Sequence, residues 1–434
     1  MSFIERSAAF PPAGAAAWPP CEAPVWRGGR PCPAPFAASG WWHPQARLAL
    51  DFRNGRYMRG GAEIEAGALL AVTRSSGIVI PNTAGVPQTI GSNTLPRTDR
   101  GLNANGQIAA LNANGNNPQS ATGWGNQGSP TLVDGPIEGI FSTLYVSGSG
   151  TARRQTAIIT VGGVVTMATK ISYGPGTNPS ASAVVVLATP GGNWVFSGAP
   201  GALATTQTGG GSVTIVRNAV GEFWFLHTTS GAGDVRVGLG AGDAAKDIKL
   251  RGIDVTQTSF VPDAWISNAS PAPAVLASDI RAVQGVRTSN GQPEPFAGWE
   301  AAGLDAACGG IAKVLIGRLS AASARFITGA GVDANNLWRV VFDTDNRFKM
   351  ILRKSGSDVL TLQSGVVSTL GLKEVVWRAK PGDYALDATD VAGATSASSE
   401  TLPAGSTTLR IGSSFSVATP FNGWIEELQI LRAV

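Results

Sequence analysis

The density of glycine and proline is the feature that most limits what this chain can fold into. The 434 residues include 56 glycines and 27 prolines. Glycine weakens helices and proline interrupts them, so long helices are excluded. Many short strands joined by turns are the architecture that fits such a composition. Because 43% of the residues are apolar, the chain can fill cores, and we predict an all-β fold.

The stretch 137–270 predicts an antiparallel β-sandwich of the jelly-roll kind. Phe223 and Phe225 point to one side of a strand while Trp224 points to the other, and the apolar alternation slips at Gly252, which indicates a β-bulge. Candidate strands follow one another at the spacing typical of a sandwich. They are 138–146, 155–161, 163–171, 183–188, 193–197, 212–217, 222–228, 234–239 and 247–256.

The stretch 296–434 predicts a second sandwich. Two alternating apolar triplets are separated by the turn-forming tetrapeptide Asp343–Asn346, so a β-hairpin is expected there. The triplets are Trp338, Val340, Phe342 and Phe348, Met350, Leu352. Later strands are predicted at 373–378, 383–387, 407–411 and 423–432.

The remaining segments complete the predicted domain organisation. Residues 1–44 carry nine of the prolines of the chain together with four tryptophans, which favours an extended arm that anchors on another protein, with packing on its own body as the alternative. Residues 45–136 hold one predicted strand that ends at Asn54-Gly55, a short helix within 63–72 and an irregular connector. Residues 271–295 read as a proline-marked linker between the sandwiches.

The rarity of histidine and cysteine excludes several function classes. The chain has 2 histidines and 3 cysteines, and it lacks paired metal-ligand motifs and a phosphate-binding glycine loop. We expect no cofactor, no metal and no disulfide framework, which suits assembly in a reducing cytoplasm. The net charge of +4 is scattered, so nucleic-acid binding is not expected. No 18-residue apolar run is present, so membrane insertion is not expected.

Three segments resemble parts of tailed-phage fibre and head-spike proteins. The first is Leu50–Tyr57 with Arg74–Gly77 and Pro96–Leu102, which resembles their N-terminal "LDF.NG.Y" and "R-x-D-x-G-L" motifs. The second, 248–266, resembles the end of a jelly roll like that of carbohydrate-binding modules. The third, Thr408–Gly412 with Phe421–Ile430, resembles the ending of concanavalin A-like, laminin-G-type lectin domains. The segment Asn103–Gly106 departs from the motif that usually follows the first.

These resemblances imply a spike or fibre on the surface of a phage or gene-transfer-agent particle. Such a protein would bind host surface or capsular polysaccharide for adsorption and would not be an enzyme. It would be assembled in the bacterial cytoplasm, form a trimer or pentamer, and attach to a capsid-vertex or tail protein through residues 1–44. Two alternatives remain open: a structural adaptor that carries another fibre, and a capsule depolymerase, whose paired carboxylates sequence cannot place.

A sugar site needs exposed aromatic rings beside side chains that hydrogen-bond hydroxyl groups. In the second sandwich the candidates are Trp338, Trp377 and Tyr384, with the hairpin residues Asp343, Asp345, Asn346 and Arg347. In the first sandwich they are Trp194 and Trp224. Several of these rings lie in strand patterns that would equally place them in a core. The hairpin carboxylates would also suit calcium, although a plain turn explains them as well.

Overall fold

The computed structural model is all-β. Its only helix among the described residues is the four-residue α1 (Ala66–Leu69). The predicted fold class is therefore confirmed. The structure describes residues 26–27, 30–31, 41–43, 45–73, 78–84, 86–91, 93–104, 111–148, 152–243, 245–258, 261–262, 265, 279–282, 306–317, 319, 324–406, 408–412, 421 and 423–432.

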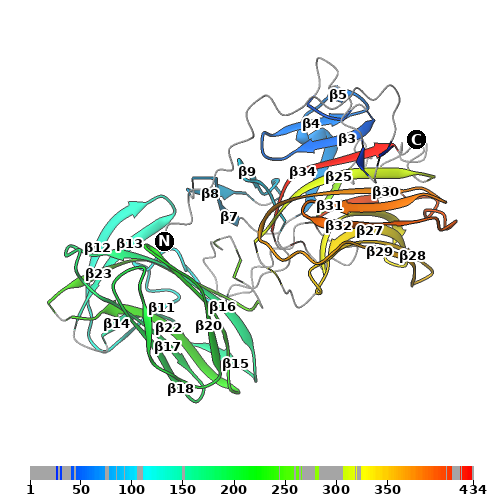
Figure 1. Cartoon of the computed structure of the whole chain (residues 1–434). Helices are drawn as coiled ribbons and strands as arrows, with labels where there is room; N and C mark the ends of the chain where they lie inside the picture. Colours follow the sequence, from blue (N-terminus) through cyan, green and yellow to red (C-terminus); the bar gives the residue numbers. More distant parts are fainter. Residues whose placement is uncertain are drawn as a thin grey trace.

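The middle sandwich, shown in cyan to green in Figure 1, consists of two antiparallel sheets. The six-stranded sheet has the order β12 (Thr131–Glu138), β13 (Phe141–Ser147), β23 (Asp247–Thr256), β16 (Thr166–Pro175), β21 (Glu222–Thr228), β20 (Ser212–Ala219). The seven-stranded sheet has the order β11 (Trp124–Gln127), β14 (Arg153–Thr156), β22 (Gly233–Ala241), β17 (Ala183–Thr189), β18 (Gly192–Gly198), β19 (Ala204–Gln207), with β15 (Ile159–Val161) also paired to β22.

Alternation along these strands builds the middle core. Phe223 and Phe225 are fully buried and pack on Phe196 of the facing sheet, with ring centroids 5.1 and 5.8 Å away. Trp224 lies on the opposite face, as predicted. The register of β16 and β23 shifts where Ser172 and Tyr173 face Gly252 and Leu250, so the predicted bulge is present.

The C-terminal sandwich is also made of two sheets. The ten-stranded sheet has the order β32 (Val391–Ser396), β31 (Tyr384–Ala388), β30 (Gly371–Ala379), β25 (Cys308–Ile316), β34 (Gly423–Arg432), β3 (Ala46–Asp51), β4 (Arg56–Arg59), β5 (Ala62–Glu63), while β10 (Gly101–Ala104) pairs with β34 and β9 (Arg97–Thr98). The seven-stranded sheet has the order β29 (Ser357–Gln363), β28 (Phe348–Lys354), β27 (Asn336–Phe342), β26 (Arg325–Asp333), β33 (Thr408–Ile411), β24 (Asp279–Ala282), β6 (Leu70–Thr73). Two short hairpins, β1–β2 (Trp26–Arg27, Arg30–Pro31) and β7–β8 (Ile78–Pro81, Pro87–Ile90), stand apart from these sheets.

Strands β3 to β6, β9 and β10, which lie between residues 46 and 104, belong to the C-terminal sandwich, although the sequence predicts a separate connector there. The β7–β8 hairpin is the exception, since Val79 packs on Phe141 and Trp265. One edge of β34 is paired first with β10 at residues 423–425 and then with β3 at residues 427–431. Figure 1 shows this as blue strands lying beside the red β34. Periodicity along a chain reports which face of a strand is apolar but not which distant strand lies beside it, so this pairing was not foreseen.

Segment 279–282, within the predicted linker, is strand β24, and it pairs with β33 and β6 of the same sandwich. The middle sandwich is therefore inserted between two strands of the C-terminal one, after β10 and before β24. Leu102 and Leu111, on the two sides of this junction, belong to different sandwiches. Leu102 pairs with Ile425, whereas Leu111 donates its N–H to the Val255 carbonyl of the middle sandwich.

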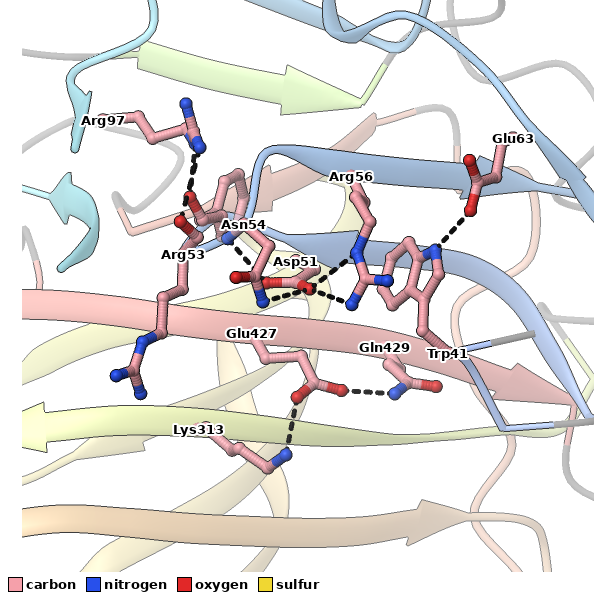
Figure 2. Close-up of polar contacts among 11 residues, drawn as sticks. Trp41, Asp51, Arg53, Asn54, Arg56, Glu63, Arg97, Lys313, Glu427 and Gln429 are labelled. Atoms are coloured by element: carbon pink, nitrogen blue, oxygen red, sulfur yellow. Dashed lines mark hydrogen bonds and ion pairs between the residues drawn. The ribbon is translucent and has the colours of Figure 1, made fainter. Parts of the chain in front are cut away.

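Polar side chains tie the N-terminal strands into this sheet, as Figure 2 shows. Asp51 accepts hydrogen bonds from Asn54 Nδ2 at 2.8 Å and from Arg56 at 2.9 Å, which closes the turn between β3 and β4. Arg97 donates to the Phe52 and Arg53 carbonyls, and this joins the segment before β10 to that turn. Asp51, Arg56 and Arg97 of the first resemblance thus have structural partners.

The described end of the predicted arm packs on its own chain. Trp41 and Trp42 lie against Ala49, Met58 and Leu431 on the outer face of the ten-stranded sheet. The Trp41 indole donates to Glu63 Oε1 at 2.7 Å. Most of residues 1–44 lie outside the described residues, so anchoring through them stays a prediction. Within the described part, no helix is long and apolar enough to cross a membrane.

Candidate functional site

The outer face of the six-stranded sheet of the middle sandwich gathers aromatic and charged side chains from five strands. Alternation explains the placement, because Ile248 and Leu250 point into the core while Lys249 and Arg251 point away from it. We call this surface the Trp224 face. Its members are Glu138, Tyr145, Arg217, Glu222, Trp224, Lys249 and Arg251.

Trp224 is partly exposed and lies at the β20–β21 end of this face. The Arg217 guanidinium carbon lies 5.0 Å from the centroid of the Trp224 ring, which is within the range of a cation–π contact. Arg217 Nε also lies 2.9 Å from Glu222 Oε2. The Trp224 Nε1–H is buried without a hydrogen-bond acceptor in the described residues. A flat ring, a cation and a carboxylate are thus held together at the surface.

Glu138 organises the other end of the face. Its two carboxylate oxygens accept hydrogen bonds from Lys249 at 2.6 Å and from Arg251 at 2.7 Å. These bonds hold the pKa of Glu138 below its ordinary value, and the bond from Lys249 has the larger effect. Arg251 also donates to the Tyr173 carbonyl at 2.9 Å, so its position is fixed. This end therefore carries one anion between two cations at neutral pH.

A buried ion pair borders Trp224 on the same face. Lys170 lies opposite Trp224 on one side and opposite Asp254 on the other. The Lys170 and Asp254 side chains are both 2% exposed, with Nζ and Oδ2 3.6 Å apart. The Trp265 ring lies 4.8 Å from Lys170 Nζ and covers it. The open part of the face therefore stops at Lys170.

The Trp224 face offers the two kinds of contact that a sugar ring uses. An aromatic ring packs against the C–H surface of a pyranose, and charged or amide groups hydrogen-bond its hydroxyls. Three of the predicted candidates cannot do this. Trp338, Trp377 and Tyr384 are all 0% exposed, and the two indoles lie 6.2 Å apart in the C-terminal core. Assigning them to a sugar site was wrong, because their strand faces point between the sheets.

The hairpin candidates form the predicted turn between β27 and β28. Asp343 and Asp345 both pair with Lys349, at 2.6 and 2.9 Å. Burial opposes ionisation of Asp343, but the hydrogen bonds from Lys349 and the Thr344 N–H, together with the charges of Lys349 and Arg339, outweigh it and lower the Asp343 pKa. Asn346 adopts a positive φ of 59°, and Arg347 donates to the Ser364 carbonyl at 2.7 Å. Asp343, Asp345 and Arg347 thus have partners within the sandwich, and contact of the four hairpin residues with a ligand stays a prediction.

Trp194 is half-buried at the end of the middle core. Its indole N–H donates to the Gly210 carbonyl at 3.1 Å, so it supports the loop before β20. It does not lie with Trp224, because β18 and β21 belong to different sheets. Sequence analysis identified Trp224 but missed its charged neighbours. The sequence does indicate that Lys249 and Arg251 are surface residues, because they alternate with buried ones. Their proximity to Glu138 depends on strands that are far apart in the sequence.

No group of three or more potential metal-ligating His, Cys, Asp or Glu side chains gathers anywhere in the described ranges. Cys308 is a free thiol within the C-terminal core, where burial raises its pKa. The other cysteines, Cys21 and Cys32, lie outside the described residues.

No protein-family model and no curated protein matches this chain. Among solved structures, the carbohydrate-binding module CBM40 of a Ruminococcus gnavus IT-sialidase, bound to α2,3-sialyllactose, is 20% identical, with a TM-score of 0.27. The match covers 31% of this chain and 80% of the CBM40 chain. Domains LG4-5 of the mouse laminin α1 chain are 9% identical, with a TM-score of 0.23, and cover 62% of this chain and 82% of their own. TM-scores this low carry no argument about function.

Proposed function

We propose that this chain is a carbohydrate-binding protein without catalytic activity, and that the Trp224 face is its binding surface. The observation that carries the proposal is the partly exposed Trp224 ring held beside Arg217 and Glu222 on the outer face of the sheet. A sugar could stack on this ring or against its arginine, while Glu138, Lys249 and Arg251 provide hydrogen bonds to hydroxyl groups farther along the face.

We further propose that the protein acts on the surface of a phage or gene-transfer-agent particle, where it adsorbs to host surface or capsular polysaccharide. This finer proposal is supported by the three sequence segments that resemble phage fibre and spike proteins. Display in many copies would turn weak single sites into firm attachment, because each further contact is made at high local concentration.

The first test is binding of the full-length protein to capsulated cells and to isogenic cells without capsule. We expect binding that depends on capsule, with the length of the polysaccharide unchanged afterwards. Shortened polysaccharide would contradict the non-enzymatic proposal and favour a depolymerase. Equal binding to both cell types, or none, would contradict the proposal and favour the adaptor.

The second test locates the site. Trp224→Ala is expected to weaken polysaccharide affinity by about 5- to 150-fold, because a stacked indole contributes on the order of 1–3 kcal/mol. Arg217→Ala should also weaken binding. Its matched control is Arg236→Ala in β22 of the other sheet. In the described residues, Arg236 forms a single ion pair, with Asp234 at 4.0 Å. Equal affinities for all three variants, with unchanged thermal unfolding, would exclude the Trp224 face.

A further inference from the structure

One flank of the middle sandwich is built from a stretch without charge. Residues 171–216 are 46 consecutive positions that contain no Asp, Glu, Lys or Arg, although charged residues make up 14% of the chain. The end of this stretch forms β19 and most of β20, which are neighbours in sequence but belong to different sheets. We call β19, residues 208–211 and residues 212–216 of β20 the charge-free flank.

Both strands of the charge-free flank are the last strand of their sheet. No other described strand pairs with the free edge of β19 or of β20, so their backbone groups there face solvent. All four residues of β19 are exposed. On and just after β20, large apolar side chains are exposed as well: Ile215 by 41%, Val216 by 50% and Val220 by 79%. A long, open and apolar edge of this kind favours pairing with another strand.

The opposite edge of the same sheet is protected. Strand β12 also exposes apolar side chains, Val133 and Ile137, but it carries Asp134 and Glu138 and is broken by a bulge at Pro136. Charges, bulges and prolines are the usual devices that prevent edge strands from pairing. The only charge on β20, Arg217, is directed to Trp224 and Glu222. Strand β20 has a bulge as well, between Ile215 and Arg217, so the two edges differ in charge and proline content rather than in regularity.

We propose that the charge-free flank is the contact surface between two copies of this chain, joined by antiparallel pairing of β20 with the same strand of the second copy. Interface cores are depleted of charged residues, which fits this flank. A neutral edge has no charged side chains that could form ion pairs with a charged partner. It meets its own copy without like-charge repulsion. A two-fold axis pairs the open β20 edge of one copy with the open β20 edge of the other.

This pairing has a consequence for the Trp224 face. Strand β21, which carries Trp224, lies directly beside β20. Pairing through β20 would therefore extend the six-stranded sheet into one continuous sheet with a Trp224 face on each half. Two sites on one rigid surface would bind a repeating polysaccharide with avidity. The interface does not depend on sugar binding, so the two proposals can fail separately.

The test is the mass of the full-length protein in solution, measured by sedimentation equilibrium over a range of concentrations. We expect a dimer at micromolar concentration. Val216→Lys, at an exposed position, should weaken dimerisation by at least about tenfold, because it places like charges opposite each other across the two-fold axis. Ile137→Lys makes the same change on the protected edge, where Ile137 is 76% exposed, and should leave the dimer intact.

Three outcomes would overturn the proposal: a wild-type monomer up to about 100 μM, a dimer that Val216→Lys does not weaken, or a dimer that only Ile137→Lys disrupts. Thermal unfolding of each variant verifies that it is folded. Binding of a short, monovalent oligosaccharide should be the same for wild type and Val216→Lys. That measurement keeps a failed interface distinct from a failed sugar site.

Discussion

The two sandwiches of this chain share an architecture but differ in how the sequence supplies their strands. The middle sandwich takes all its strands from one continuous stretch, residues 124–256. The C-terminal sandwich takes its strands from residues 46–104, 279–282 and 308–432. Its last strand, β34, pairs along one edge with β3 and β10 from the N-terminal part of the chain.

This difference shows that a domain need not correspond to one continuous stretch of the sequence. A continuous sandwich can form from contacts made within itself. A discontinuous one must close a long loop before its first and last strands meet, and that closure costs entropy. The core of the C-terminal sandwich contains Leu48, Phe52 and Leu102 beside Ile425 and Leu428. Neither terminal part of the chain can therefore bury its apolar faces alone.

The largest expected effect comes from cutting the chain between the parts of the C-terminal sandwich. We expect residues 111–258 to fold cooperatively as an isolated fragment, whereas residues 296–434 alone should lack a cooperative thermal transition, because β34 would have an unpaired edge and the core would be open. Circular dichroism and NMR spectra measure both. A chain in which about 20 Gly/Ser residues replace 105–278 is the control and should fold. A well-dispersed spectrum from 296–434 alone would contradict the comparison.

Single core truncations should then separate the two sandwiches in the full-length chain. Phe52→Ala and Phe196→Ala remove rings that are both 0% exposed, and each should cost about 3–5 kcal/mol of unfolding free energy. We expect Phe52→Ala to lower only the C-terminal transition and Phe196→Ala only the middle one, as followed by calorimetry. If Phe52→Ala lowered the middle transition instead, residues 46–104 would not belong to the C-terminal sandwich.

Acid should destabilise the middle sandwich through His227. This side chain is 2% exposed, both ring nitrogens lack hydrogen-bond partners in the described residues, and burial lowers its pKa from 6.5 to about 4. Because protonation favours the unfolded state, this stability is fully present above pH 6.5. It decreases as the pH falls to 4, by on the order of 3 kcal/mol.

Urea unfolding from pH 7 to pH 4 measures this effect, with the middle transition followed separately. His227→Met replaces the titrating ring by an apolar side chain and should remove that part of the pH dependence. Unchanged pH dependence in this variant would assign the acid sensitivity to other groups. The C-terminal transition of the same protein is the internal control.

The smallest effect is expected at the polar tie that holds the N-terminal strands. Arg97→Met removes the bonds to the Phe52 and Arg53 carbonyls and should cost about 1–2 kcal/mol in the C-terminal transition alone. Arg236→Met, in the middle sandwich, removes a half-exposed guanidinium and should cost less than about 0.5 kcal/mol. Equal costs for the two variants would mean that Arg97 is not needed to hold the turn.

Much of the fold could be predicted because its signals are local. Alternation placed most strands of the middle sandwich close to their observed bounds, and the Asp343–Asn346 tetrapeptide marked a real hairpin turn. Alternation missed β19, and it missed β11 and β12, where an irregular connector was predicted. The alternation also separated Trp224 from Phe223 and Phe225. The same pattern could not decide whether the face carrying Trp338 was solvent-facing or core, because an exposed aromatic stripe and a buried one have the same period.

The candidate site shows the same division. Trp224 was identified from its own strand, but Glu138 lies 111 positions from Lys249 and meets it only because β12, β13 and β23 are neighbours. The absence of charge in 171–216 is visible in the sequence. Its exposure on two edge strands is visible only in the fold.

The sequence by itself determined that the chain is all-β, where most of its strands lie and which faces of them are apolar, because these properties follow from backbone preferences and a two-residue period. Only the tertiary structure decided which strands are neighbours. It joined β3 and β10 to β34 and inserted one sandwich into the other. Strand pairing depends on the total free energy of burying distant surfaces together, and no stretch of sequence carries that sum alone.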